Sequence, residues 1–233
     1  MSFAVIYKGK SCTELGILPV RRPSIPSPKL RTEEIEIPGR DGVLIETDDC
    51  YGQITIPVEF NFLTSPDSWN DIYRRAKRWI RGTGNLSFSD DPEFFYKVLY
   101  CNITDTERTS RRLGNFTAEF VCEPYSYLYD GQSKKTIADC LYNSNMVCHP
   151  IYKISWNGTC ILTVNGKNMS ATVGQNLTID TDLMIAYRTD GDINNIAVTG
   201  NYEDLWLQEG EKDRKSTRLN SSHIGSSRMP SSA

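Results

Sequence analysis

Residues 53–62 alternate polar and apolar side chains so regularly that they fit only a strand with one buried face. The apolar positions of this segment are Ile54, Ile56, Val58, Phe60 and Phe62. Successive side chains of a strand point to opposite faces, whereas an amphipathic helix needs apolar residues every three or four positions. The shorter alternation over residues 33–37 predicts a second half-buried strand.

Turns and short apolar segments extend this pattern over the first 125 residues. Residues 3–7 and 13–18 are predicted to pair as an opening hairpin, and residues 86–88, 96–103 and 116–122 are predicted to be strands. Residues 21–28 contain three prolines, which lack a backbone N–H, and are therefore predicted to be an extended connector. The chain is predicted to be mainly β.

One helix interrupts the strands. Ser65 is placed to cap it, Pro66 suits its first position, Asp67 suits the positive end of its dipole, and Gly82 suits its end. Its predicted core face consists of Trp69, Ile72, Tyr73, Ala76, Trp79 and Ile80. Its other side is basic, with Arg74, Arg75, Lys77, Arg78 and Arg81. Such a face can bind phosphates but more often contacts water or acidic neighbours.

A second β-rich domain is predicted after a junction at residues 131–150. Its expected strands are residues 152–156, 160–164, 171–173, 177–179, 184–187 and 193–198. Turn signals at Asn157-Gly158, Asn165-Gly166 and Asp190-Gly191 separate them. Short strands at this spacing favour a β-sandwich. The expected organisation is therefore an N-terminal β-sandwich or barrel-like domain with one packed helix at 1–130, followed by a second sandwich at 151–212.

The last 21 residues differ in character from the rest. Residues 213–233 read DRKSTRLNSSH, IGS and SRMPSSA, and resemble the translation of a sequencing adapter with a short barcode. They are therefore expected to be non-native, which would make the sandwich a truncated one. This segment contributes four basic residues and one acidic residue, so the net charge without it is −6 rather than −3.

Composition argues against several function classes. An acidic chain offers no general attraction for nucleic acid, and no apolar segment reaches the roughly 18 residues of a membrane helix. The N-terminal residues carry no signal-peptide pattern. The seven cysteines are irregularly spaced, which predicts free thiols rather than a disulfide framework.

Candidate reactive groups are sparse. The Asp90-Asp91 pair precedes Pro92 and is read as a solvent-exposed turn rather than an acid/base pair. His149 is the one histidine before residue 213, and it is expected at the surface. Cys148-His149 lacks a second pair for a metal site, and the loop from Asp190 lacks the glycine and glutamate of a calcium loop. The sequence predicts no enzyme, no cofactor and no metal.

Three spaced motifs point to a known family. They are residues 37–42 (IPGRDG), residues 88–96 (FSDDPEFFY), and residues 112–116 (RLGNF) followed by residues 122–125 (CEPY). In order and spacing they resemble the N-terminal domain of the distal tail proteins of long-tailed phages. The motif residues taken as structural are Pro38, Gly39, Arg40, Asp41, Gly42, Asp90, Asp91, Pro92, Gly114, Phe116, Pro124 and Tyr125.

The resemblance implies a structural role. Members of this family form a hexameric hub that joins the tail tube to the baseplate or tail tip, and carry a galectin-like C-terminal domain. Expected partners are therefore other copies of the chain, the tail tube protein, a tail-tip or tail-associated lysin protein and, as in some family members, a receptor-binding protein. The virion would be assembled in the bacterial cytoplasm. No membrane and no sequence-specific nucleic acid is expected.

A different class of function is also open. Galectin-like sandwiches can bind sugars on exposed aromatic rings, which makes a carbohydrate-binding module the alternative. Trp156 and Trp206 are the tryptophans of the second domain available for such a platform.

Overall fold

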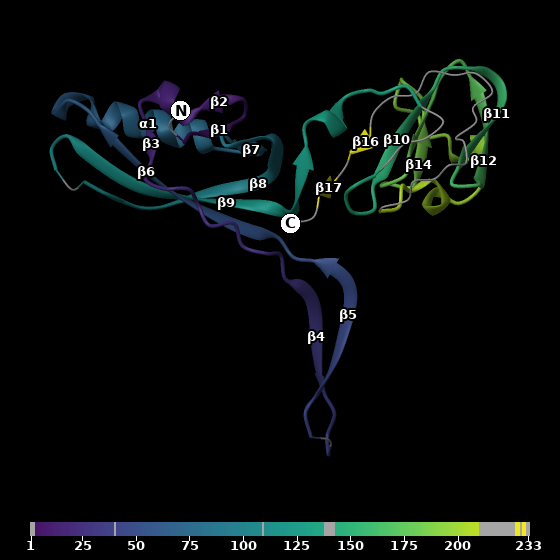
Figure 1. Cartoon of the computed structure of the whole chain (residues 1–233), viewed down its shortest axis with the longest axis horizontal. Helices are drawn as coiled ribbons and strands as arrows, with labels where there is room; N and C mark the ends of the chain where they lie inside the picture. The colour runs from purple at the N-terminus through teal and green to yellow at the C-terminus, as the bar shows by residue number, and fades with distance from the viewer. Residues whose placement is uncertain are drawn as a thin grey trace. The chain divides into compact units, whose positions relative to one another are not determined.

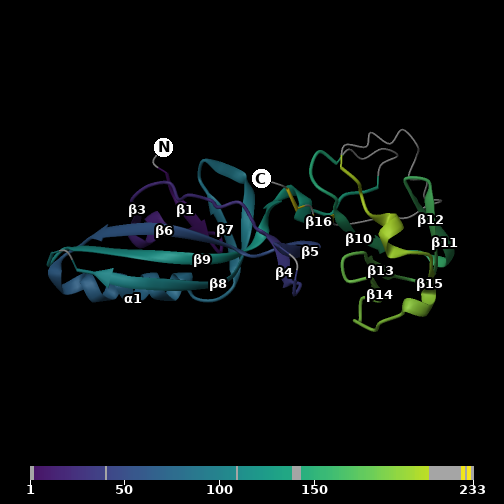
Figure 2. The same ribbon diagram turned by 90° about the horizontal axis from the view of Figure 1, so that it is seen from below.

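The computed structural model describes residues 3–39, 41–108, 110–137, 143–209, 227–228 and 230–231. The chain divides into two compact units, Met1–Ser126 and Tyr127–Ser232. Both units are built mainly from antiparallel strands, as the sequence predicts, and Figures 1 and 2 show their ribbons.

The strands of the first unit form one large sheet and one separate two-stranded sheet. The strand order in the large sheet is β2-β1-β7-β8-β9-β6-β3, and the two-stranded sheet is β4-β5. The bounds of the strands are β1 Val5–Tyr7, β2 Lys10–Ser11, β3 Leu18–Pro19, β4 Leu30–Glu36, β5 Val43–Tyr51, β6 Ile54–Leu63, β7 Gly84–Phe88, β8 Asp91–Glu107 and β9 Leu113–Leu128.

Strand β6 has the alternating burial that its sequence predicts. Its five apolar residues from Ile54 to Phe62 are each at most 4% exposed, and the residues between them lie on the other face. The strand pairs antiparallel with β9 over ten positions, so that Phe60 lies opposite Phe116. This pairing places the apolar side chains of β6 and β9 on the same face of the sheet, and that face forms one side of the hydrophobic core.

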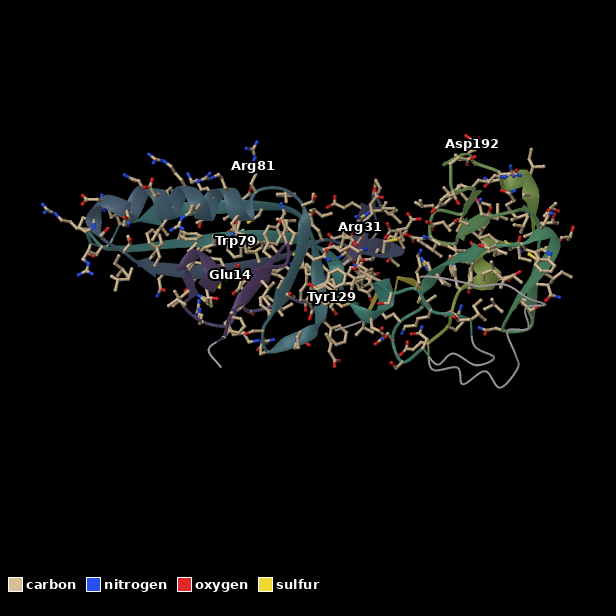
Figure 3. The ribbon with its side chains drawn as sticks, turned by 90° about the horizontal axis from the view of Figure 1, so that it is seen from above. Glu14, Arg31, Trp79, Arg81, Tyr129 and Asp192 are labelled. Atoms are coloured by element: carbon tan, nitrogen blue, oxygen red, sulfur yellow. The ribbon has the colours of Figure 1, made fainter. Side chains whose placement is uncertain are left out.

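Helix α1, Trp69–Ile80, covers that core with its apolar face. Trp79 contacts the rings of Phe60 and Tyr7, with centroids 5.9 and 6.2 Å away, and its Nε1 donates to the Tyr7 carbonyl oxygen at 3.2 Å. Figure 3 shows Trp79 on the inner side of the helix and Arg81 pointing outward from its end. The predicted core face is confirmed: Trp69, Ile72, Ala76, Trp79 and Ile80 are buried, and Tyr73 packs at the edge of the cluster.

The start of the helix differs in detail from the expectation. Pro66–Ser68 forms a 3-10 turn, η2, before α1, and Ser65 precedes that turn. The Ser65 hydroxyl donates to the Ser68 hydroxyl and makes no cap to a backbone N–H. The helix ends at Ile80, and Gly82 follows with φ of 85°.

The predicted opening hairpin is wrong. Strand β1 pairs with the two-residue β2, and Cys12–Leu15 forms a 3-10 helix, η1, instead of a strand. Ser11 and Glu14 form a reciprocal capping box, and Gly16 ends the turn with φ of 74°. These local hydrogen bonds outweigh the apolar composition, and the strand that follows, β3, pairs with β6.

Strands β4 and β5 form a hairpin that leaves the sheet, which we call the arm (residues 30–51; Figure 1). The turn predicted at residues 38–42 joins these two strands. Strand β5 is not among the predicted strands. The prediction of a half-buried strand at residues 33–37 is wrong, because every side chain of β4 except Ile35 is exposed. The polar-apolar alternation here reflects no buried face within this chain.

The second unit has two small sheets around one apolar cluster. The sheet orders are β14-β13-β10-β16 and β11-β12-β15. The strands are β10 His149–Ile154, β11 Asn157–Val164, β12 Lys167–Gly174, β13 Leu177–Asp180, β14 Ile185–Tyr187, β15 Val198–Thr199 and the two-residue β16 Ser227–Arg228; β17 spans Pro230–Ser231. Three 3-10 turns complete the unit, namely η3 Asp130–Gln132, η4 Asn195–Ala197 and η5 Tyr202–Leu205.

One predicted turn of this unit is confirmed and one is wrong. Asn165 and Gly166 both have positive φ, 49° and 76°, and join β11 to β12 as a tight hairpin. Asn157 and Gly158 instead begin β11, because β10 pairs with β13 and not with β11. Of the segment 193–198, predicted as one strand, η4 takes three residues and only the last belongs to β15.

The residues expected to be non-native lie mostly outside the described part of the chain. Within 213–233 the structure describes only β16 and β17. The predicted junction is also described in part, since residues 138–142 lie outside it.

Candidate assembly surface

The arm exposes apolar side chains along both of its strands. Val43, Leu44 and Ile45 are 43%, 43% and 61% exposed, and Leu30 and Ile37 are 40% and 39% exposed. An isolated two-stranded hairpin is marginally stable in water, because neither face is covered. Neighbouring apolar residues exposed on such an element are typical of a surface that contacts another molecule.

The arm is also strongly acidic. Residues 30–51 contain seven acidic and two basic residues. Glu33 lies directly opposite Glu46 in the register of β4 and β5. Like charges opposite each other destabilise a strand pair, so this arrangement is more favourable when a cation lies nearby.

Helix α1 presents the opposite charge on its outer side. The segment 69–81 carries one acidic and five basic residues, and Arg74, Arg75, Lys77, Arg78 and Arg81 are all exposed. Arg74 forms an ion pair with Asp71 at 3.1 Å, and the Lys77 ammonium lies 4.5 Å from the ring centroid of Tyr73. In Figure 3, Arg81 and other nitrogen-bearing side chains extend from the side of the helix that faces away from the sheet.

The first motif forms the tip of the arm. Gly39 and Gly42 have φ of 79° and 81°, which residues with a Cβ rarely adopt. Pro38 and Asp41 are exposed beside them, and Arg40 lies outside the described residues. The motif is therefore a turn, as predicted.

The second motif connects β7 to β8. Asp90 is exposed in the turn and forms an ion pair with Arg22 of the proline-rich connector at 2.6 Å. Asp91 is half-buried as the first residue of β8, which corrects the expectation that both carboxylates face water, and Pro92 is exposed. Asp90 is thus held by an arginine in the turn, and Asp91 belongs to the strand that follows it.

The third motif belongs to β9. Gly114 lies opposite Phe62, and the Phe116 ring stacks on Phe60 with centroids 5.3 Å apart. Farther along the strand, Tyr125 contacts Tyr51 of the arm edge-to-face at 6.2 Å, and Pro124 is half-buried. The structure thus brings the end of this motif to the base of the arm.

His149 lies at the surface with its side chain 36% exposed, and its ring contacts two other side chains. Its Nδ1 lies 3.0 Å from the Asp182 carboxylate, and its ring stacks on Trp206 with centroids 4.3 Å apart. Trp206 also donates its Nε1 to the Thr181 carbonyl oxygen at 3.2 Å. This leaves Trp156, which is 41% exposed, as the tryptophan of the second unit with an open ring.

The cysteines are free thiols in the described residues. Cys12, Cys122, Cys148 and Cys160 are buried, Cys101 is half-buried and Cys50 is exposed; Cys140 lies outside the described residues. Burial raises the pKa of the Cys122 and Cys148 thiols to about 12. Such thiols are poor nucleophiles at neutral pH.

Among the side chains that the structure describes, no three His, Cys, Asp or Glu residues gather closely enough to hold a metal ion. No described helix is both long and apolar enough to cross a membrane.

Comparison with known proteins agrees with the arrangement of strands and helix. Residues 10–122 match the phage tail protein RIFT-related domain family. The crystal structure of the SPP1 Dit protein, described as a paradigm of the hub adsorption apparatus in phages that infect Gram-positive bacteria, is similar with a TM-score of 0.58. That similarity covers 99% of each chain at 14% identity, so it establishes the shared fold. No curated protein sequence matches the chain.

The glycines of residues 38–42 predict the turn at the tip of the arm, but the acidic surface below that turn was not predicted. The signal was present in the apolar triplet at 43–45 followed by Glu46 and Asp48. The matched domain and the shared fold together agree with the resemblance read from the three motifs. Residues 10–122 therefore belong to the phage tail protein RIFT-related domain family, and the chain as a whole has the fold of a distal tail protein.

Proposed function

We propose that this chain is a structural subunit of the tail tip, forming a hexameric hub that joins the tail tube to the baseplate. The observation that carries the proposal is the arm, which exposes both faces and several apolar side chains from a domain of a tail protein family. An element of this kind gains stability only when another molecule covers it. A ring of identical subunits supplies such a cover for every arm at once.

The partners follow from this position in the virion. Besides other copies of the chain, they are the tail tube protein on one side and a tail-tip or tail-associated lysin protein on the other. A receptor-binding protein attached to the hub is a further partner. Assembly would take place in the bacterial cytoplasm, and no catalytic step is assigned to the chain.

The test is the mass of the purified protein in solution, measured by light scattering over a range of concentrations, alone and with the tail tube protein. We expect a species of six copies in at least one of these conditions. A matched variant that lacks residues 30–51, joined by a short glycine linker, should remain folded and lose the assembly. A protein that stays monomeric in every condition contradicts the proposal.

A second candidate function rests on Trp156, whose ring is open to solvent. An exposed tryptophan can stack on a sugar ring, which supports a carbohydrate-binding role for the second unit. Binding to a glycan array that disappears in the Trp156→Ala variant would favour this function. Binding that is unchanged in that variant, or no binding, would count against it.

A further inference from the structure

The first unit has an acidic surface on the arm and a basic surface on helix α1, and no ion pair among the described residues joins the two. The arm carries Glu33, Glu34, Glu36, Asp41, Glu46 and Asp48 on exposed positions, and the outer side of α1 carries five exposed basic residues. Among the described residues no ion pair joins the arm to the helix. Figure 1 shows why: the arm extends away from the sheet, whereas α1 lies along it at a distance from the arm.

We propose that the acidic arm of one copy docks on the basic outer face of helix α1 of the next copy. The inference deepens the proposed ring and rests on it, because it names the two surfaces that meet in the subunit contact. The docked arm would bring carboxylates to Arg75, Arg78 and Arg81, for which no described ion pair exists. It would also cover Leu44, which lies on the same face of the arm as Glu33 and Glu46 in the strand register.

Charge complementarity supports this choice of occupant. The arm has a net charge of −5 over residues 30–51, and the segment 69–81 has a net charge of +4. The cross-strand pair of Glu33 and Glu46 repels in the free arm. A guanidinium between the two carboxylates would convert this repulsion into attraction, with paired hydrogen bonds.

The geometry of such a contact also fits a closed assembly. The arm and α1 are different surfaces, so the contact is heterologous: each copy offers its arm to one neighbour and its helix to the other. Heterologous contacts produce rings when the rotation closes and filaments when it does not. Self-pairing of two arms would instead stop at a dimer and would place acidic strands against each other.

Two charge-reversal variants test the proposal. The arm variant carries Glu33→Lys and Glu46→Lys, and the helix variant carries Arg75→Glu and Arg78→Glu. All four side chains are exposed, so folding should persist, and circular dichroism with thermal melting checks it. If a reversal fails to fold, Glu33→Gln with Glu46→Gln, or Arg75→Gln with Arg78→Gln, replaces it. The control is Lys134→Glu with Lys153→Glu, which changes charge equally on exposed residues of the second unit.

The expected result has two parts. Each reversal should raise the concentration at half-assembly by about tenfold or more, because several exposed charge pairs become repulsive. Mixing the two variants in equal amounts should restore assembly, because each variant's arm then meets an oppositely charged helix on its neighbour. Restored particles should contain both variants in equal proportion by mass spectrometry.

Other outcomes separate the possible failures. Reversal variants that assemble like the unmodified protein overturn this contact while leaving the proposed ring intact. If the four substitutions combined in one chain restore assembly but the mixture does not, the contact is within a chain and the inference is wrong. An unmodified protein that never assembles overturns the ring as well. A helix variant that loses retention on double-stranded DNA but still assembles would assign the basic face to nucleic acid instead.

Discussion

Gly114 of β9 lies directly opposite Phe62 of β6, and the phenyl ring occupies the space that a side chain at position 114 would need. A Cβ added at Gly114 would lie 2.6 Å from Phe62 Cε1, well inside van der Waals contact. Phe62 is 1% exposed and packs against Trp69 with ring centroids 5.4 Å apart, so it has little room to move. The RLGNF motif therefore needs glycine at position 114, because a larger residue would displace the Phe62 ring that packs against Trp69 of the helix.

We predict that Gly114→Ala destabilises the first unit by about 1–3 kcal/mol, which is typical of overpacking a core. The measurement is the denaturant midpoint followed by tryptophan fluorescence. Gly52→Ala is the control, because a Cβ there would meet only the Lys29 carbonyl oxygen at an ordinary 3.6 Å. Phe62→Leu combined with Gly114→Ala should recover part of the loss, and equal destabilisation by both alanine variants would contradict the packing argument.

Alkaline pH should destabilise the first unit. Burial, followed by the nearby Cys101 and Cys122 thiols, raises the pKa of Tyr7 to about 12, and burial also raises the pKa of Cys101 and Cys122 to about 12. These groups favour the folded state while they are protonated. Their contribution is complete below pH 9, where the unfolded thiols begin to ionise, and is lost as the pH rises toward 12.

The measurement is the melting temperature between pH 8 and pH 11.5. We expect a steady fall above pH 9, and a shallower fall in the Cys122→Ala variant, which has one fewer group to ionise. A melting temperature that does not change over this range would show that these groups titrate alike in the folded and unfolded states.

Thiol reactivity should follow burial. Cys50 is exposed on the arm, whereas Cys12, Cys122, Cys148 and Cys160 are buried. Brief iodoacetamide treatment at pH 8, followed by peptide mapping, should modify Cys50 first and the four buried thiols only after denaturation. Under the proposed ring, assembly should also slow the labelling of Cys50. Rapid labelling of Cys148 in the folded protein would contradict its placement.

Asp180 should matter more than its neighbours in the second unit. It is 5% exposed, and its Oδ1 accepts hydrogen bonds from the backbone N–H groups of Asp182 and Leu183 at 3.1 and 3.0 Å. Asp180→Ala leaves these donors without that acceptor and should cost about 1–3 kcal/mol. Asp190→Ala is the matched control, because its hydrogen bond to the Asp192 N–H at 3.2 Å is in an exposed turn that water can satisfy. Thermal melting distinguishes the two.

The sequence alone determined those elements in which the pattern of apolar and polar residues matches the burial of the side chains. Strand β6 and the core face of α1 could be predicted because their apolar residues recur with the period of a strand and of a helix, respectively. The hairpin at Asn165-Gly166 could be predicted because Asn and Gly are the residues favoured in turns that need positive φ, and both adopt it here. The three motifs likewise identified the family, since turns and close approaches restrict which residues fit.

Tertiary structure decided what depends on distant partners. Asn157-Gly158 has the composition of a turn but begins a strand, because β10 pairs with β13 across an intervening hairpin. Residues 33–37 alternate as a half-buried strand does, yet they lie in an arm with both faces in solvent. Periodicity reports that a face is suited to burial, but not whether the molecule that buries it is the same chain or, as we propose for the arm, the next one.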